Sequence, residues 1–128
     1  MTETWEGGCL CGDVRFRAHG APKWTIWCHC QSCRKHSGAP AAAFACFEVT
    51  NVEMLAGEIT RFRSSAHTVR GFCARCGSTL TCGGDQAPGE EHIHIGAFDR
   101  AADLPPRLEY FAEERLPWVH TELAARAG

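Results

Sequence analysis

Seven of the nine cysteines in this 128-residue chain lie in three short clusters, and this framework constrains the fold more than any other feature. The clusters read C-L-C, C-H-C-Q-S-C and C-A-R-C, with ligand candidates Cys9 and Cys11, then Cys28, Cys30 and Cys33, and finally Cys73 and Cys76. The opening residues contain no basic segment followed by an apolar run, so we expect no secretory signal and a reducing, cytoplasmic location. An odd number of cysteines in such a compartment argues against a disulfide framework and favours metal binding.

The spacing within each cluster suits metal ligation. Residues i and i+2 of a strand point to the same face, so each C-x-C pair would present two sulfurs to one ion. The C-x-x-C pair precedes Gly77, which can adopt the positive φ that closes a tight turn around a metal. The simplest partition is a closed four-thiolate site made by Cys9, Cys11, Cys73 and Cys76. Zinc is the expected ion, and iron is the less favoured metal. The alternative without a metal is that these cysteines are buried free thiols.

The remaining cluster provides three ligands, Cys28, Cys30 and Cys33, for a second zinc. Three protein ligands and one open position are typical of catalytic zinc, and such an ion would bind an incoming thiol as thiolate. Alternatively, a fourth protein ligand closes the site. The candidates are Cys46, Cys82, His36, His67, His92 and His94, whereas His29 would alternate away from its neighbours on a strand. Cys46 and Cys82 lie among apolar or small residues, where a single cysteine usually fills the core.

Short segments of alternating apolar and polar residues dominate the chain, with glycine and proline between them. They predict an all-β fold that covers residues 1–128 as one domain. The expected strands are 14–18, 24–28, 41–47, 58–63, 67–73, 78–82, 92–98 and 107–111. Near the C-terminus, Leu116–Leu123 is expected to form a short helical turn, because Pro117 suits a first turn and Val119 and Leu123 are four residues apart.

Composition excludes several classes of partner. The net charge is -2, and the 13 lysines and arginines are scattered among 15 acidic residues, which argues against a nucleic-acid partner. No window approaches the roughly 20 apolar residues that span a bilayer, so we expect no membrane association. Arg34, Lys35 and His36 directly follow the third cysteine of the middle cluster. These cations would offset the charge of a thiolate site and attract carboxylates, or form a solvated basic turn. The sequence leaves the oligomeric state open.

The chain carries an ordered set of motifs that covers nearly its whole length: G-C-L-C-G at 8–12, C-H-C-Q-S-C-R-K at 28–35, H-S-G-A at 36–39, a segment at 57–65, G-F-C-A-R-C-G-S at 71–78 and R-L-P-W at 115–118. This set resembles the glutathione-dependent formaldehyde-activating enzyme family, which includes the domain of centromere protein V. The resemblance implies a β-tent of several small coiled antiparallel sheets with zinc knuckles. It also implies a structural zinc on Cys9, Cys11, Cys73 and Cys76 and a catalytic zinc on Cys28, Cys30 and Cys33.

The reaction that the resemblance implies is the condensation of formaldehyde with glutathione to S-(hydroxymethyl)glutathione, which is a carbon–sulfur lyase reaction run in reverse. We therefore expect a zinc-dependent, lyase-like enzyme with two Zn²⁺ per chain, acting on glutathione or a related thiol and on formaldehyde or another small aldehyde. Arg34 or Lys35 would contact the carboxylates of the thiol substrate. The alternatives are a non-catalytic, zinc-stabilised binding or structural domain and a module that handles metal or thiols.

Overall fold

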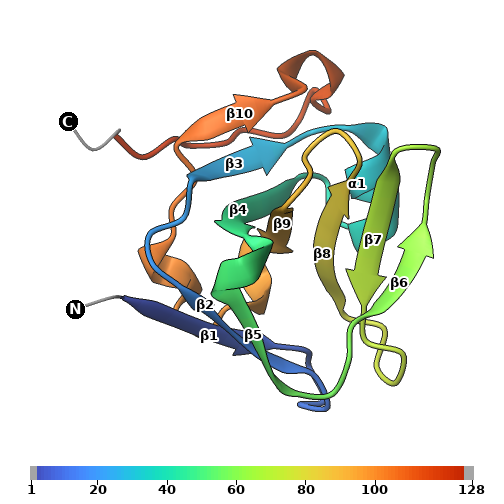
Figure 1. Ribbon diagram of the computed structural model, residues 1–128. Helices are drawn as coiled ribbons and strands as arrows, with labels where there is room; N and C mark the ends of the chain where they lie inside the picture. Colours follow the sequence, from blue (N-terminus) through green and yellow to red (C-terminus); the bar gives the residue numbers. More distant parts are fainter. Residues whose placement is uncertain (1–2, 126–128) are drawn as a thin grey trace.

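In the part of the chain that the structure describes, ten strands form two sheets beside one short α-helix (Figure 1). The structure, a computed structural model, describes residues 3–125. The smaller sheet is antiparallel, with the order β1-β2-β5, and consists of β1 (Thr4–Gly8), β2 (Arg15–His19) and β5 (Val52–Ala56). This architecture confirms the predicted all-β class.

The larger sheet has the order β10-β3-β4-β9-β8-β7-β6. Its strands are β3 (Trp24–Cys28), β4 (Ala42–Glu48), β6 (Thr60–Arg63), β7 (Thr68–Phe72), β8 (Thr79–Gly84), β9 (Glu90–His94) and β10 (Leu108–Tyr110). All neighbouring strands are antiparallel except β10, which runs parallel to β3. The helix α1 (Gln31–Ser37) follows β3, and short 3₁₀ turns lie at Val49–Asn51, Ile95–Ala97, Ala101–Asp103 and Ala112–Glu114.

The core is divided between the two faces of the larger sheet. One face packs against the smaller sheet, and the main cluster there includes Trp5, Phe16, Phe47, Leu80, Ile93 and Phe98. The other face carries a second cluster made by Ile26, Cys28, Cys33, Ala42 and Phe44. Because β4 alternates along its length, its successive side chains contribute to different clusters. The cysteines of the middle sequence cluster therefore lie on the face opposite the main core.

Two strands and the helix were not expected from the sequence. In β1, Gly7 lies where an added Cβ would come within 2.4 Å of the Ala97 carbonyl oxygen, so close backbone approach replaces the usual apolar side chain. In β5 four of the five residues are exposed, which removes the alternation that marks a half-buried strand. The helix α1 is only seven residues long, too short to show a clear helical period.

The expected helical segment Leu116–Leu123 forms one turn, in which the Val119 amide donates to the Leu116 carbonyl over 3.0 Å, and then continues without helix. The segment is held instead by contacts with distant residues. The Trp27 indole donates to the Glu122 carbonyl over 3.1 Å, and the Ala124 amide donates to the Pro106 carbonyl over 2.8 Å. A few residues cannot meet the nucleation cost of a helix when tertiary hydrogen bonds compete. No helix in the described part is long and apolar enough to cross a membrane.

Candidate metal centres and the adjoining cavity

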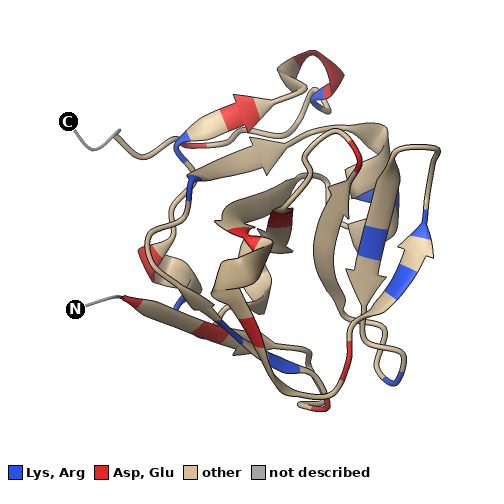
Figure 2. Cartoon of the chain, in the orientation of Figure 1, with Lys and Arg blue, Asp and Glu red and all other residues tan. Residues whose placement is uncertain are grey.

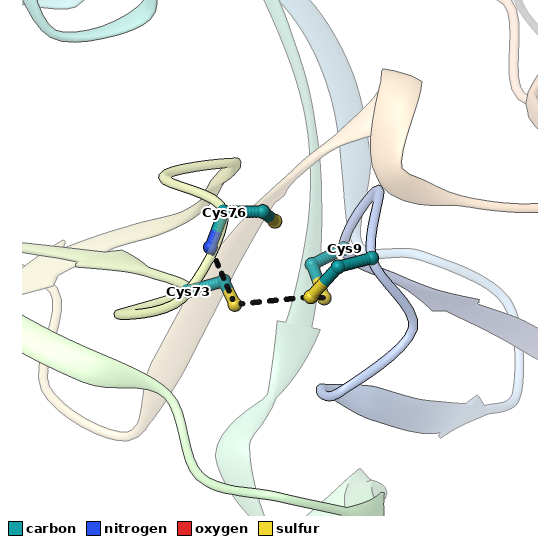
Figure 3. A group of neighbouring side chains, drawn as sticks. Cys9, Cys73 and Cys76 are labelled. Carbon is teal, nitrogen blue, oxygen red and sulfur yellow. Dashed lines mark hydrogen bonds between the residues drawn. The ribbon is translucent and has the colours of Figure 1, made fainter.

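Four cysteines from two distant turns meet between the sheets. Cys9 and Cys11 lie in the turn that follows β1, and Cys73 and Cys76 lie in the turn between β7 and β8. The sulfur of Cys11 is 3.6 Å from that of Cys9 and 3.8 Å from that of Cys73. Figure 3 shows Cys9 facing Cys73 and Cys76 across the gap between the two turns. Sulfurs at the corners of a tetrahedral zinc site are about 3.8 Å apart, so this set fits zinc.

Backbone amides support the sulfurs within each turn. The Val14 amide donates to the Cys9 sulfur over 3.3 Å, and the Cys76 amide donates to the Cys73 sulfur over 3.5 Å. Gly77 has φ of 78°, and its amide donates to the Cys73 carbonyl over 2.8 Å, as expected for a turn that closes around a metal. Each turn thus fixes the position of one of its two sulfurs through a backbone amide.

The middle cluster forms a second group. Cys28 is the last residue of β3, Cys30 caps the N-terminus of α1 and Cys33 lies in the first turn of that helix. The Cys28 sulfur is 3.5 Å from the Cys30 sulfur and 3.3 Å from the Cys33 sulfur. The Cys33 amide donates to the Cys30 sulfur over 3.3 Å. These distances also fit three corners of a zinc tetrahedron to within about 0.5 Å.

The sequence argument for the C-x-C pairs was wrong in one respect. It placed each pair on a strand, whereas Cys9 and Cys11 lie in a turn and Cys30 lies beyond the end of β3. Turns bring the sulfurs together more closely than the roughly 6.6 Å spacing of residues i and i+2 on a strand would do. His29, between two of these cysteines, is fully buried, and its Nε2 is 3.0 Å from Oε1 of Glu109 on β10.

Within residues 3–125, no other cysteine, histidine or acidic side chain joins the three sulfurs of the second group within 4.8 Å. Among the candidates for a fourth ligand, Cys82 lines the same cavity, and burial raises the pKa of its thiol to about 11. Cys46 instead belongs to a separate group with Glu90 and His92. There the Lys23 ammonium is 2.5 Å from Glu90, which leaves little negative charge to attract a cation.

A cavity of about 460 Å³ opens beside the three sulfurs. Its walls are largely apolar and include Trp24, Ile26, Phe44, Tyr110 and Phe111. The parallel pairing of β10 with β3 places Tyr110 opposite Cys28, so the C-terminal part of the chain forms one wall above the cysteines. The second group therefore lies at the floor of a cavity large enough for a small molecule.

Arg70 is the functional candidate that the sequence did not single out. It lies on β7, is 4% exposed, and donates from Nη1 to the Cys33 sulfur over 3.4 Å. A buried guanidinium needs a negative partner, and the thiolates provide it. The alternation of apolar and polar residues along a strand does not distinguish a buried arginine from an exposed one, because it carries no information on what covers the polar face. Figure 2 shows basic residues on β6 and β7, at the end of the sheet that Arg70 occupies.

Arg34 and Lys35 do not line this cavity. They line a separate cavity together with Leu116 and Trp118. Neither residue therefore lies where a substrate bound beside the three sulfurs would be in the cavity. Among residues 3–125, Arg70 is the only lysine or arginine that lines that cavity.

The buried His94 lies close to His36, which is half-buried. The rings of His36 and His94 are 6.3 Å apart, and the His94 ring packs against Phe44 at 4.3 Å. Burial, and then the positive charges of His36 and Arg70, lower the pKa of His94 to about 4. Burial also lowers the pKa of His36. Both histidines are therefore neutral near pH 7. His67 lines the cavity beside the second cysteine group and is exposed.

Comparisons with known proteins agree with the motifs. A family model described as glutathione-dependent formaldehyde-activating enzyme matches residues 4–114. A protein of Halomonas elongata, provisionally named a glutathione-dependent formaldehyde-activating enzyme, is 29% identical over 128 aligned residues, covering 91% of this chain and 80% of that protein. An uncharacterized lyase of Schizosaccharomyces pombe is 33% identical over 76 residues, covering 59% of this chain and 55% of the yeast protein.

Among solved structures, a protein of Rhodobacter sphaeroides has the same fold. Its crystal structure matches with a TM-score of 0.66 and 18% identity, covering 82% of this chain and 99% of that one. At this level of identity the likeness concerns the fold alone.

Proposed function

The chain belongs to the glutathione-dependent formaldehyde-activating enzyme family, and on this premise we propose that it is a two-zinc enzyme that joins a thiol to formaldehyde or another small aldehyde. The observation that carries the proposal is the group of three cysteine sulfurs at the floor of a cavity, with no fourth ligand beside them among residues 3–125. The relatives named as a lyase and as a formaldehyde-activating enzyme support a reaction at a carbon–sulfur bond.

The reaction balances without a further reactant. A bond forms between the thiol sulfur and the carbonyl carbon, the π electrons of the carbonyl move to its oxygen, and the thiol proton ends on that oxygen. A zinc ion held by Cys28, Cys30 and Cys33 would lower the pKa of the incoming thiol and hold it as thiolate. The closed group of Cys9, Cys11, Cys73 and Cys76 would hold the second zinc for stability alone.

The chain's own side chains would prepare the site in two ways. Arg70, 3.4 Å from the Cys33 sulfur, offsets the excess negative charge of three thiolates around a divalent ion. The apolar walls reduce the amount of water around the thiolate, which strengthens electrostatic interactions inside the cavity. Holding the thiol and the aldehyde together there converts a bimolecular encounter into an oriented attack.

Zinc content and rate together test the proposal. We expect two zinc ions per wild-type chain and one in Cys30→Ser, measured by mass spectrometry of the metal. Exchange NMR of glutathione and formaldehyde should show faster formation of S-(hydroxymethyl)glutathione with the wild type, and only the uncatalysed rate with Cys30→Ser. Cys46→Ala, which removes a buried thiol outside both groups, should keep two zinc ions and the wild-type rate.

Two results would contradict the proposal in different ways. A single zinc ion in the wild type would remove the second centre. Two zinc ions with a rate equal to the uncatalysed reaction for several thiols and aldehydes would indicate a zinc-stabilised binding domain instead.

A further inference from the structure

The cavity above the second cysteine group has a mainly apolar lining with few charged groups. It contains five large apolar side chains, Trp24, Ile26, Phe44, Tyr110 and Phe111. Its polar side chains are Ser32, Thr68, Gln86, His67 and His92 besides Arg70, and no carboxylate of residues 3–125 lines it. Arg70 is its one lysine or arginine within residues 3–125, and that guanidinium already donates to Cys33. Glutathione carries two carboxylates and an ammonium group. A cavity built for it would need acidic and basic partners for these charges, since buried charges without partners are costly.

The aromatic side chains at the mouth are unusually placed. Tyr110 is 43% exposed and Phe111 is 49% exposed, although both are large and apolar. The Tyr110 ring lies 5.8 Å from the Trp24 ring, and Trp24 in turn lies 4.6 Å from His92, so flat rings follow one another along one wall. Exposed aromatic rings that line a cavity mark a surface that binds apolar groups.

Phe111 also has a strained backbone. Its φ is 56°, and it is the one non-glycine residue with positive φ in the described part of the chain. Such a conformation persists where the surroundings impose it, and it occurs often at ligand clamps. Here Phe111 lies between β10 and the 3₁₀ turn Ala112–Glu114, and Glu114 accepts a hydrogen bond from the Gln31 amide at the start of α1. The backbone that carries Phe111 is thereby connected to α1, and the Phe111 side chain lines the cavity.

We propose that the thiol taken by this cavity has a compact aromatic body, in place of the charged tripeptide glutathione, and that Phe111 selects it by covering that body. The inference rests on the proposed function, because the sulfur of this thiol takes the open position beside Cys28, Cys30 and Cys33. The aromatic body then lies between the Phe111 ring and the wall formed by Trp24 and Tyr110.

Binding of three thiols to the zinc-loaded full chain tests this proposal by isothermal titration calorimetry under anaerobic conditions. Phenylmethanethiol carries the aromatic body, 2-mercaptoethanol has the thiol without it, and glutathione has the charges. We expect phenylmethanethiol to bind at least about tenfold more tightly than either of the others, because a ring leaves water on binding. Zinc content is measured in each sample.

Variants then identify the selecting residue. Phe111→Ala and Phe111→Gly should both reduce the affinity for phenylmethanethiol about tenfold and leave that for 2-mercaptoethanol unchanged. The glycine variant also relieves the positive φ, so agreement between the two assigns the effect to the ring. Phe62→Ala is the matched control, since Phe62 is an aromatic residue, 58% exposed, that lies outside this cavity.

The outcomes separate the inference from the function on which it rests. Glutathione binding as tightly as phenylmethanethiol would overturn the inference and leave the proposed function in place. An equal loss in Phe62→Ala would overturn the role of Phe111. If no thiol binds while two zinc ions are present, the thiol-accepting position does not exist, and the proposed function fails together with the inference.

Discussion

The net charge around the second cysteine group depends on single residues that contact it, above all on Arg70. The sequence predicted the three sulfurs because their spacing is local, and it did not predict Arg70, which reaches Cys33 from a strand 37 positions later. Arg70 is buried where it contacts Cys33 of α1, and no property of residues 67–73 reveals that contact. The same applies to His94, which the sequence could describe only as a candidate fourth ligand.

Replacement of Arg70 should weaken the second metal centre selectively. In Arg70→Leu the thiolates lose a buried positive partner, so we expect zinc affinity at Cys28, Cys30 and Cys33 to fall by about tenfold or more, as for other residues that contact metal ligands. Arg70→Lys should retain part of the affinity. Competition with a chromophoric chelator measures both ions, and the four-cysteine site serves as the internal control. Wild-type affinity at both sites in Arg70→Leu would contradict this role.

His94 should make the fold sensitive to mild acid. Its pKa is about 4 in the folded chain and about 6.5 when unfolded, so the unfolded state binds the proton first. The contribution of neutral His94 is therefore complete above about pH 6.5 and is lost as the pH falls toward 4. We expect about 2 kcal/mol of this loss between pH 7 and pH 5.

Urea denaturation at several pH values measures the effect in the wild type and in His94→Phe, which keeps the ring contact with Phe44. Thiol protonation affects both proteins equally, so the difference between their profiles reports His94. The variant should show the shallower slope, with a remainder from His36. Parallel profiles would show that His94 does not contribute.

At the level of elements, the sequence predicted those strands whose side chains alternate and missed those that pair for other reasons. Strand β2 was predicted at 14–18 because apolar and charged residues alternate there. In the structure Phe16 and Ala18 are buried and their charged neighbours are not. Strand β1 depends on a glycine at a close backbone contact, and β5 pairs with β2 while its side chains stay exposed. The N-cap of the helix α1 is Cys30, which the sequence had assigned to metal binding alone. One residue thus serves as both helix cap and ligand.

At the level of the whole molecule, the four-cysteine group connects the two sheets. Cys9 and Cys11 extend from the smaller sheet, and Cys73 and Cys76 belong to the larger one. The sequence predicted this grouping as the simplest partition, which joins one C-x-C pair to the C-x-x-C pair. It could not predict how many strands each sheet contains, since the pairing of β10 with β3 joins segments 82 positions apart.

Removal of the proposed zinc should loosen the contact between the smaller and the larger sheet before the strands within either sheet lose their pairing. With a strong chelator we expect faster hydrogen exchange in β1 and β2, because the cross-link between the turns is lost, while β4, β8 and β9 at the centre of the larger sheet remain protected for longer. Hydrogen exchange measured by mass spectrometry gives the rates for each segment. Cys30→Ser, which lacks only the second centre, should keep wild-type protection in β1 and β2. Uniform exchange across both sheets would contradict this order.

The two cysteine groups also differ in when they can exist during synthesis of the chain. Cys28, Cys30 and Cys33 leave the ribosome almost together. Cys11 leaves it 62 residues before Cys73, which is about 3 to 12 s at ordinary rates of translation. During that interval Cys28, Cys30 and Cys33 can already bind zinc together, whereas Cys9 and Cys11 still lack their two partner ligands. In a cell with little zinc, newly made chains should therefore accumulate with the second cysteine group filled and the two sheets not yet joined.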